Sequence, residues 1–479
     1  PMSKEYYTTI GLEIHAELNT NSKMFCGCVN NPDLPTGQAG EEKPNLNICP
    51  VCMAHPGTLP VINKKAVESV IKVGLALNAS IADFTEFDRK NYFYPDIPKA
   101  YQISQYKFPI VSGGELSGVK ITRIHLEEDT ANNKHDRGDY SLVDFNRAGV
   151  PLMELVTEPV INSAKQAGDF GRELQLLLRT LGVSEANMDK GQMRVELNIS
   201  ISDDPNTLGT KCEVKNINSF RSVERAAEYE IKRMSELLDS GKGSEIVQET
   251  RGWDENKQST FSQRSKENAN DYRYFPDPDL PKLYLSEVFD IEKLKSELPE
   301  LPVTKRNRYK SEYGIKDEDI ESYIVDTELG SWFESVAKIL KDKEKIKTAS
   351  NYITSDYLGI KKSNAEAKLP SVENFAELIN MVTEAQISSR AAKDILAMIV
   401  IEDASPAKIA EEEDLIQKND EGALKEIAQR IIDANPQVVA TYRGGKENAL
   451  MSLVGQIMKE TKGSANPALV QKILKELLT

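Results

Sequence analysis

The sequence has no uninterrupted apolar run of the roughly 18 residues that a membrane-spanning helix needs. It also lacks a P-loop, the glycine-rich phosphate-binding motif of many nucleotide-binding enzymes. The first residues, Pro1 to Glu5, include no apolar core of the kind found in secretory signals. We therefore expect a cytoplasmic protein, and any nucleotide must be bound without a P-loop.

A surplus of basic residues is missing as well, since the net charge of the 479 residues is −15. Nucleic-acid binding depends largely on neutralising phosphates, so most of the chain is a poor candidate for it. Residues 441–479 differ, with a local charge of +3. Their basic residues are Arg443, Lys446, Lys459, Lys462, Lys472 and Lys475. Any contact with nucleic acid is therefore expected at the C-terminus.

Cysteine is scarce, with five residues, which argues against a disulfide-stabilised scaffold. Four of them form two close pairs, Cys26 with Cys28 and Cys49 with Cys52. Two pairs of thiolates match a tetrahedral structural zinc site, and four unrelated buried cysteines are the alternative. Such a site has no open position, so zinc would fix a loop and take no part in chemistry. Cys212 stands alone and is interpreted as a core residue.

The pattern of the chain predicts an α+β domain followed by helices. Up to residue 298, short alternating runs typical of strands lie between three expected helices, 64–77, 163–181 and 222–238. Irregular alternation of strands and helices favours an antiparallel sheet. Beyond residue 298 helical periodicity dominates, and Pro406 is a suitable first residue of a helix. The predicted domains are 1–298, 299–404 and 405–479.

Acidic side chains recur at alternate positions of several expected strands. In residues 10–18 the even positions are apolar, so Glu13, His15 and Glu17 share the opposite face. Glu154 lies inside an apolar run, where a carboxylate must be paired or metal-bound. The same alternation groups Arg123, His125 and Glu127; Arg194, Glu196 and Asn198; and Lys211, Glu213 and Lys215.

A single strand of this kind is usually the solvated face of a half-buried sheet. Several strands that each carry a carboxylate, together with a histidine, instead favour a hard cation. Mg²⁺ prefers oxygen ligands and is usually completed by nucleotide phosphates. We therefore predict a Mg-ATP site on the acidic faces of these strands.

Longer motifs coincide with a known family. Residues 142–159, LVDFNRAGVPLMELVTEP, resemble the defining motif of the GatB/GatE family. Segments 11–15, 87–96, 99–105, 215–220 and 271–276 resemble it too, and 455–459 and 463–467 resemble its tail domain. The resemblance covers nearly the whole chain and is weakest between about 300 and 440.

This resemblance implies a glutamine-synthetase-like cradle domain with an antiparallel sheet, an all-α helical domain and a small α-helical YqeY-like tail. It also implies one component of a heterotrimer, alongside an amidase (A) subunit that makes ammonia and a small C subunit. The chain would use Mg-ATP to phosphorylate the side-chain carboxylate of Glu-tRNA(Gln) or Asp-tRNA(Asn). Ammonia would then displace the phosphate, and the tail would contact the tRNA backbone.

The family pattern also implies site residues. Those of the metal and nucleotide site are Glu13, His15, Glu127 or Glu128, Glu154, Glu196 and Glu213. Of these, Glu13, His15, Glu128 and Glu154 are predicted to hold magnesium. Candidate cations for the phosphates are Arg123, Arg147, Lys211 and Arg273, each of which could equally be structural. Only part of the family has the cysteine quartet, so zinc would be dispensable for activity.

Other interpretations stay open. The chain could be a non-catalytic, zinc-bearing tRNA-binding adaptor in which the carboxylates only maintain the fold. It could also be a ligase for a free amino acid, although a small substrate would not need the basic tail. Residues 89–94, a polar and aromatic run, could line a passage for ammonia or form an ordinary packing strip, which is the interpretation we favour for Phe93.

Overall fold

The computed structural model describes residues 6–30, 43–134, 138–265, 271–417, 421–461, 463 and 465–478. The chain divides into two compact units, Pro1–Leu301 and Pro302–Thr479. Within these described ranges, no helix combines the length and the apolarity that crossing a bilayer requires. The three predicted domain ranges stay predictions.

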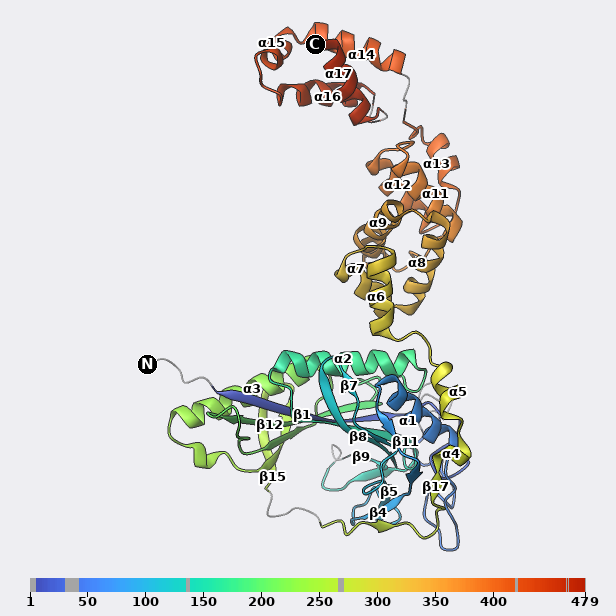
Figure 1. Ribbon diagram of the computed structural model, residues 1–479, viewed down its shortest axis with the longest axis vertical. Coiled ribbons are helices and arrows are strands. Elements are labelled where there is room, and N and C mark those ends of the chain that lie inside the picture. The colour runs from blue at the N-terminus through green and yellow to red at the C-terminus, as the bar shows by residue number, and fades with distance from the viewer. Residues whose placement is uncertain are drawn as a thin grey trace. The chain divides into compact units, whose positions relative to one another are not determined.

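A ten-stranded sheet forms the centre of the first unit (Figure 1). Its strand order is β15-β14-β13-β12-β1-β11-β8-β6-β2, and β7 pairs with β8. The strands are β1 (Tyr7–Glu17), β2 (Ser80–Ile81), β6 (Val111–Ser112), β7 (Glu115–Leu116), β8 (Val119–Glu128), β11 (Pro151–Thr157), β12 (Met193–Ser202), β13 (Cys212–Lys215), β14 (Glu249–Asp254) and β15 (Ser259–Ser265). Their described pairings are antiparallel except β13 with β14, which is parallel. The mixed α+β class is confirmed, with this one departure from an antiparallel sheet.

Three smaller sheets lie in the same unit. One has three strands, β4 (Asp88–Asn91), β5 (Tyr101–Ser104) and β16 (Phe275–Pro276). The others are the pairs β9 (Asn132–Lys134) with β10 (Leu142–Asp144) and β3 (Phe84–Thr85) with β17 (Leu283–Tyr284). The short helices are η2 (Gly243–Glu245), α4 (Leu285–Val288) and α5 (Ile291–Ser296).

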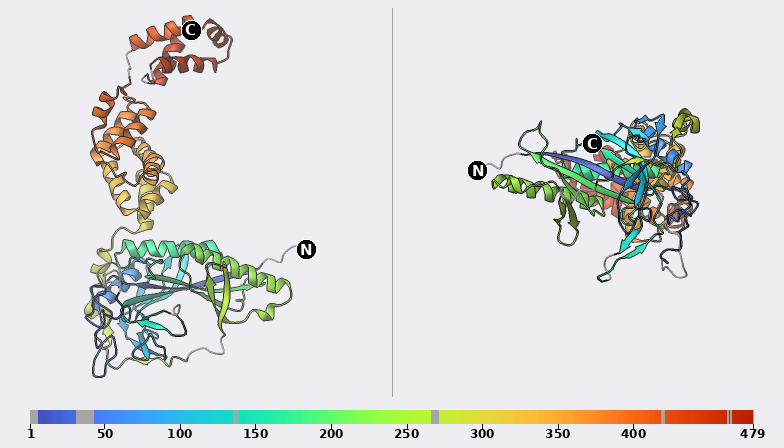
Figure 2. Two further views of the ribbon diagram at one scale, coloured as in Figure 1. Left: turned by 180° about the vertical axis from the view of Figure 1, so that it is seen from behind. Right: turned by 90° about the horizontal axis from the view of Figure 1, so that it is seen from below.

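Three long helices, α1 (Lys64–Ala76), α2 (Ala164–Thr180) and α3 (Phe220–Asp239), lie along the large sheet (Figure 1, and from behind in Figure 2). The apolar side chains of the sheet and of these helices form one core, which includes Cys212 as predicted. The three predicted helices are therefore confirmed. Helix α3 begins two residues before its predicted start, because the side chain of Ser219 accepts a hydrogen bond from a free backbone N–H of the first turn.

The second unit is helical, as predicted for the later part of the chain. Its first helices are α6 (Pro302–Glu312), α7 (Asp317–Val325), α8 (Thr327–Leu340), α9 (Lys343–Asn351), the π-helical turn η4 (Tyr352–Tyr357), α10 (Leu358–Ser363), α11 (Val372–Thr383), α12 (Ser389–Ile399) and α13 (Pro406–Glu412). The last are α14 (Glu421–Ala434), α15 (Pro436–Arg443), α16 (Ala449–Glu460) and α17 (Pro467–Leu478). Pro406 is the first residue of α13, as predicted. Helices α14–α17 share an apolar core of their own.

Candidate active site

Four adjacent strands of the large sheet place one polar residue each in a single row. Across β12, β1, β11 and β8, the paired residues are Arg194, His15, Glu154 and His125. Residues directly opposite each other in a sheet point to the same face. The neighbours of these residues along each strand, such as Ile14 beside His15, point to the opposite face and lie in the apolar core that the sheet shares with the helices. The polar row therefore lies on the face of the sheet away from that core.

Glu154 lies between the two histidines of this row. Its Oε2 atom is 3.2 Å from His15 Nε2 and 3.4 Å from His125 Nε2. Glu127 joins them, with its carboxylate oxygens 3.7 Å from each histidine Nε2. Glu13 Oε1 is 3.9 Å from His15 Nε2. The carboxylate inside an apolar run is thus paired, as the sequence requires.

The titration of these groups follows from burial and from one another's charge. Burial lowers the pKa of His15 and of His125, but Glu154 and Glu127 raise both values to about 9. Although burial opposes the shift, the two histidines hold the pKa of Glu154 well below its usual value. Burial and the charges of Glu154 and Glu196 raise the pKa of Glu13 to about 7. A bound cation would favour the ionised form of Glu13.

A second group of acids adjoins Glu13. Glu13 is paired with Glu196 in the sheet register, and Glu213 follows on β13. One oxygen from each of these three carboxylates lies within 4.8 Å of the others. Lys215 Nζ is 2.9 Å from Glu196 and 3.4 Å from Glu213. Asn198, two residues from Glu196 on β12, has a buried Oδ1 atom with no hydrogen-bond partner in the described part of the chain.

The donor set fits a divalent cation. Three overlapping groups have ligand atoms within 4.8 Å of one another, namely Glu13 with His15 and Glu154, His125 with Glu127 and Glu154, and Glu13 with Glu196 and Glu213. The last group offers only oxygen, which is the ligand that Mg²⁺ prefers. Because Glu13 and Glu154 each belong to two groups, the whole face forms one continuous site; below, the acidic cluster means Glu13, His15, His125, Glu127, Glu154, Glu196 and Glu213.

Glu128 lies apart from this cluster. It is the neighbour of Glu127 in β8, and successive residues of a strand point to opposite faces. Lys99 Nζ is 2.6 Å from its Oε1 atom, which also accepts a hydrogen bond from the backbone N–H of Ile103. Of the two carboxylates that the sequence left as alternatives, the structure brings Glu127 to the cluster.

The predicted phosphate-binding cations are placed differently from one another. Arg123 Nη2 is 3.6 Å from Glu154 Oε1, at the edge of the cluster. Arg147 donates to the carbonyl oxygen of Thr130 and lies 3.7 Å from Asp129. Lys211 and Arg273 are exposed, and neither has a polar contact with the cluster among the described residues.

Four residues that border the cluster, Lys90, Asp129, Arg194 and Lys215, are absent from the predicted metal and nucleotide site. Asp129 Oδ2 accepts a hydrogen bond of 2.9 Å from Arg194, which belongs to the polar row. Lys90 is half-buried beside the cluster; burial lowers its pKa, but the charge of Glu127 raises it above the usual value. Lys215 is the fourth. Alternation grouped Arg194 and Lys215 with acidic neighbours, but only the strand register shows what they face.

Phe93 corrects an expectation. The preferred interpretation was an ordinary packing residue, yet its side chain is 90 % exposed. Its neighbour Tyr92 does pack, with its ring 5.8 Å from that of Tyr272. The run 89–94 therefore divides into packed and exposed aromatic residues.

The four paired cysteines come together, as predicted. Sγ atoms of Cys26, Cys28, Cys49 and Cys52 lie within 4.8 Å of one another. Zinc–sulfur bonds of about 2.3 Å in a tetrahedron place sulfur atoms about 3.8 Å apart, so small shifts would complete the site. The hydrogen bond from Cys26 lowers the pKa of Cys52 to about 4, while burial opposes the shift. A thiolate is the form that binds a metal.

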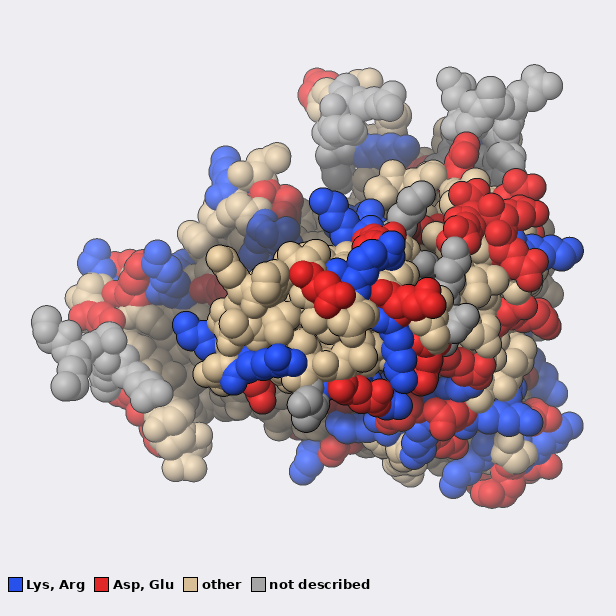
Figure 3. Space-filling view, turned by 90° about the horizontal axis from the view of Figure 1, so that it is seen from above, with Lys and Arg blue, Asp and Glu red and all other residues tan. Residues whose placement is uncertain are grey.

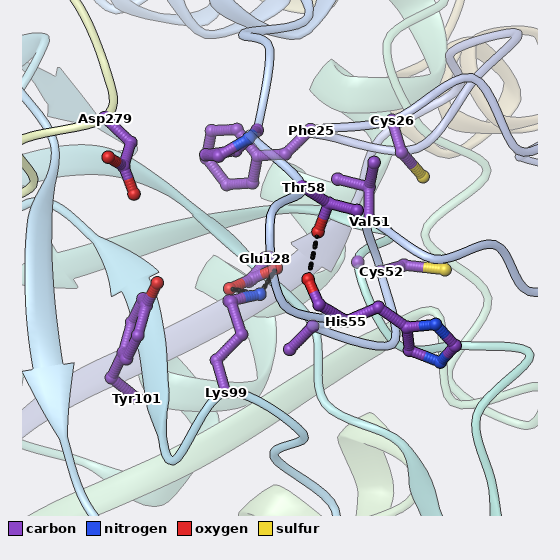
Figure 4. A pocket seen from close by; sticks show the side chains of 13 residues that line it. Phe25, Cys26, Val51, Cys52, His55, Thr58, Lys99, Tyr101, Glu128 and Asp279 are labelled. Carbon is purple, nitrogen blue, oxygen red and sulfur yellow. Dashed lines mark hydrogen bonds and ion pairs between the residues drawn. The ribbon is translucent and has the colours of Figure 1, made fainter.

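A small cavity of about 100 Å³ adjoins this quartet (Figure 4). Cys26 and Cys52 line one side of it, and Lys99, Tyr101 and Glu128 line another. The side chains of Lys99 and Glu128 point toward each other, so their charges are already paired (Figure 4). The cavity is thus separate from the acidic cluster, although it is lined by the residue that follows Glu127.

The geometry describes a mixed α+β protein with a cluster of carboxylates and histidines on one sheet face and four cysteines gathered in one place, each with ligand atoms close enough together to hold a metal ion. Two family models match the chain, the GatB/GatE catalytic domain over residues 8–290 and the GatB domain over residues 331–478. The chain belongs to the GatB/GatE family.

Several curated relatives match over the full length. Each is named as the B subunit of an aspartyl/glutamyl-tRNA(Asn/Gln) amidotransferase. The relative from Brevibacillus brevis is 43% identical over 100% of this chain and 99% of its own. The relative from Gloeothece citriformis is 41% identical over 100% and 99%, and that from Chlorobium chlorochromatii is 44% identical over 98% of both chains.

Proposed function

We propose that this chain uses Mg-ATP to phosphorylate the side-chain carboxylate of Glu-tRNA(Gln) or Asp-tRNA(Asn), as the B subunit of an amidotransferase. The observation that carries the proposal is the convergence of carboxylates from five strands, β1, β8, β11, β12 and β13, on one face of the sheet. The substrate class follows from the names of the full-length relatives.

The proposed reaction has two steps. A carboxylate oxygen of the aminoacyl group attacks the γ-phosphorus of ATP, the bond to the β-phosphate breaks, and ADP leaves. Ammonia then attacks the acyl carbon, phosphate leaves with the bonding electrons, and the nitrogen loses a proton to give the amide. The first step is needed because a free carboxylate is a poor electrophile. The protein's task is mainly to position the reactants and balance charge.

Within the cluster, Glu13, Glu196 and Glu213 would hold Mg²⁺, together with Glu154. The cation, when bound, would neutralise charge on the phosphates. The two histidines keep Glu154 ionised and fix its orientation. Arg123 lies next to Glu154 and can meet a phosphate oxygen, and Arg147 is a further candidate. We do not assign Glu128 to the metal, because it forms an ion pair with Lys99. The assignment of Lys211 and Arg273 to the phosphates has less support than that of Arg123 and Arg147.

Ammonia must reach the acyl phosphate before water does. We propose that it passes along the packed part of the run 89–94. Lys90 Nζ lies 4.9 Å from the centre of the Tyr272 ring, and its charge is balanced by Glu127 of the cluster. Tyr272 also packs against Tyr92 and Tyr274. Ammonia would come from an amidase (A) subunit, held to this chain by a small C subunit.

The remaining assignments are proposals too. The large sheet would be a glutamine-synthetase-like cradle, the cysteine quartet would hold a structural zinc ion, and the last helices would be a YqeY-like tail that binds tRNA. In the view of Figure 3, Lys and Arg side chains are scattered among Asp, Glu and uncharged residues, Asp and Glu gather toward the upper right, and the described residues form no continuous basic surface there. Of the predicted basic residues in the tail, Lys446 and Lys459 are exposed, and Lys462 lies outside the described residues.

The test is to assemble the chain with the amidase and the small C subunit and to supply ATP and misacylated tRNA without glutamine. The wild-type complex should cleave ATP when the charged tRNA is present and should accumulate acyl phosphate, which hydroxylamine traps. Glu13→Gln and Glu154→Gln should lose about 100-fold or more of this activity, the usual range for removing a charge-stabilising group. Glu115→Gln, at an exposed acid on β7, is the control.

Two results would contradict the proposal. If the variants cleave ATP at the wild-type rate, the cluster does not hold the nucleotide. If the wild type binds tRNA tightly but forms no acyl phosphate, the chain is a tRNA-binding adaptor. Acyl phosphate formed on free glutamate with equal efficiency would indicate a ligase for a free amino acid.

A further inference from the structure

Lys23 is a buried lysine next to the cysteine quartet. Its exposed fraction is 1 %, and its Nζ atom donates to the carbonyl oxygens of Asn47 at 2.8 Å and Phe145 at 3.5 Å. No Asp or Glu oxygen of the described residues lies within 4.0 Å of this nitrogen. Burying an ammonium group is costly unless an opposite charge compensates it. The ammonium therefore calls for an anionic partner of another kind.

The quartet supplies that partner. Lys23 Nζ lies 3.9 Å from Cys52 Sγ, so its positive charge is next to the quartet. A zinc ion with four thiolates has, by charge count, a net charge of −2. A centre of that charge inside the protein needs a cation close by, and Lys23 is in contact with one of its four cysteines. The buried lysine has no carboxylate partner among the described residues, and the thiolate cluster needs a positive charge nearby. Each group therefore compensates the charge of the other.

Lys23 also connects the cysteine quartet to the acidic cluster through a series of contacts. The carbonyl oxygen of Phe145, which it contacts, lies two residues before Arg147. The next residue, Met24, donates its backbone N–H to Gly149 at 2.7 Å. Gly149 in turn donates to the carbonyl oxygen of Asp129 at 2.9 Å.

This path ends in the polar row of the sheet. Asp129 accepts a hydrogen bond from Arg194, which is paired with His15. Each step from the quartet to the row is thus a direct contact between described residues. A displacement of Lys23 would first shift segment 145–149 and then Asp129.

Gly149 lies beside the Lys23 side chain. Its φ of +89° is a conformation that favours glycine. A Cβ atom at this position would lie 3.5 Å from Lys23 Cδ and 3.7 Å from Cys52 Cβ. The segment that carries Arg147 therefore lies next to both the lysine stem and the quartet, with room for ordinary van der Waals contact.

We propose that Lys23 is the counter-ion of the zinc–thiolate centre and a positioning residue that fixes segment 145–149 relative to the acidic cluster. The inference rests on the proposed zinc site and, for the positioning role, on the proposed phosphoryl transfer. Lys23 touches neither substrate nor nucleotide in this assignment. It acts through Gly149, Asp129 and Arg147.

The first test measures zinc alone. Lys23→Met preserves the length of the side chain and removes the charge, and Lys120→Met is the control at an exposed lysine of β8. In the zinc-loaded full-length chain, Lys23→Met should release zinc to a chelator about tenfold faster or more, while Lys120→Met releases it at the wild-type rate. Cobalt in place of zinc should show a shifted thiolate-to-metal absorption band only in Lys23→Met. Wild-type release and an unshifted band would overturn the proposal.

A second measurement needs no variant, so it holds if Lys23→Met fails to fold. In the wild-type chain, the Lys23 amine should be at least about tenfold less reactive toward an acylating reagent with zinc than after chelation, as mapped by mass spectrometry. The reactivity of Lys120 should not change. Equal reactivity of Lys23 with and without zinc would overturn the counter-ion assignment.

The positioning role is tested in the assembled complex. Lys23→Met with zinc kept in excess should raise the KM for ATP severalfold, with a smaller change in kcat, because Arg147 is displaced while the acidic cluster stays intact. Lys23→Arg should restore part of this loss. An unchanged KM would overturn the positioning role. If the wild-type complex forms no acyl phosphate, the proposed function fails, whereas the zinc and labelling results still decide the counter-ion role.

Discussion

Glu154 and its two histidines explain how a carboxylate is tolerated inside an apolar run. Each histidine Nε2 atom is within 3.4 Å of Glu154, and the three groups support one another's charged forms. Burial alone would push all three toward their neutral forms. The charged forms of His15 and His125 therefore depend on the negative charge of Glu154.

This dependence gives a prediction for the metal-free protein. In Glu154→Gln, the pKa of His15 and of His125 should fall from about 9 toward or below the usual value, because burial still lowers both while the main opposing charge is gone. NMR titration of the histidine ring protons measures both values. Glu115→Gln should leave them unchanged, and values that stay near 9 in Glu154→Gln would contradict this account of the charge balance.

At the residue scale the sequence predicts much of the site. Alternation correctly placed Glu13 and His15 on one strand face, and a lone acid in an apolar run identified Glu154. Alternation within one strand cannot show which residues of different strands meet. That is why Glu127 and Glu128 stayed alternatives and why the partners of Arg194 and Lys215 were missed.

At the scale of elements, the loop that carries Arg147 is fixed by backbone contacts with the start of the cysteine loop. The central one is the hydrogen bond from Met24 N–H to the carbonyl oxygen of Gly149. Gly149 tolerates its positive φ because it has no Cβ. This junction can be weakened without replacing a proposed ligand.

We therefore predict that Gly149→Ala loosens the junction. A side chain in this left-handed region costs about 1–2 kcal/mol, which corresponds to roughly tenfold faster hydrogen exchange of the Met24 amide. Hydrogen-exchange mass spectrometry of the zinc-loaded chain measures it. Gly27→Ala is the control, since its added Cβ meets nothing within 4 Å and its φ is ordinary. Unchanged exchange at Met24 in Gly149→Ala would contradict this role of Gly149 at the junction.

The elements themselves were largely predictable, because amphipathic periodicity is a local property. All three predicted helices are present, and α13 begins at the predicted proline. The parallel pairing of β13 with β14 was not predicted. A helix, α3, lies between these two strands in the chain, and such a crossover permits parallel pairing. The edge of the sheet to which β14 is added depends on packing over the whole domain. Local sequence patterns contain no information about that packing.

At the scale of the whole molecule, the proposal assigns catalysis to the first unit and tRNA binding to the end of the second. The net charge of −15 is compatible with this only if the tRNA contacts are confined to a small basic region. Lys446 is an exposed lysine of that region, beside Gly444 and Gly445.

Lys446→Ala should weaken tRNA binding severalfold and reduce the slope of log Kd against log salt by about one unit or less, the effect of one lost phosphate contact. The affinity for ATP should not change, because the nucleotide site is built by other residues. Filter binding at several salt concentrations measures the slope. Lys338→Ala, at an exposed position of α8, is the control, and equal slopes for the two variants would contradict a tRNA contact at Lys446.

The central claim is that the acidic cluster holds a divalent cation together with ATP. A crystal structure with Mn²⁺ and a non-hydrolysable ATP analogue tests it most directly, since the anomalous signal locates the metal. The account predicts a manganese peak bound by Glu13, Glu196 and Glu213 together with Glu154, with the triphosphate beside it. A nucleotide bound elsewhere, with no metal at these carboxylates, would contradict it.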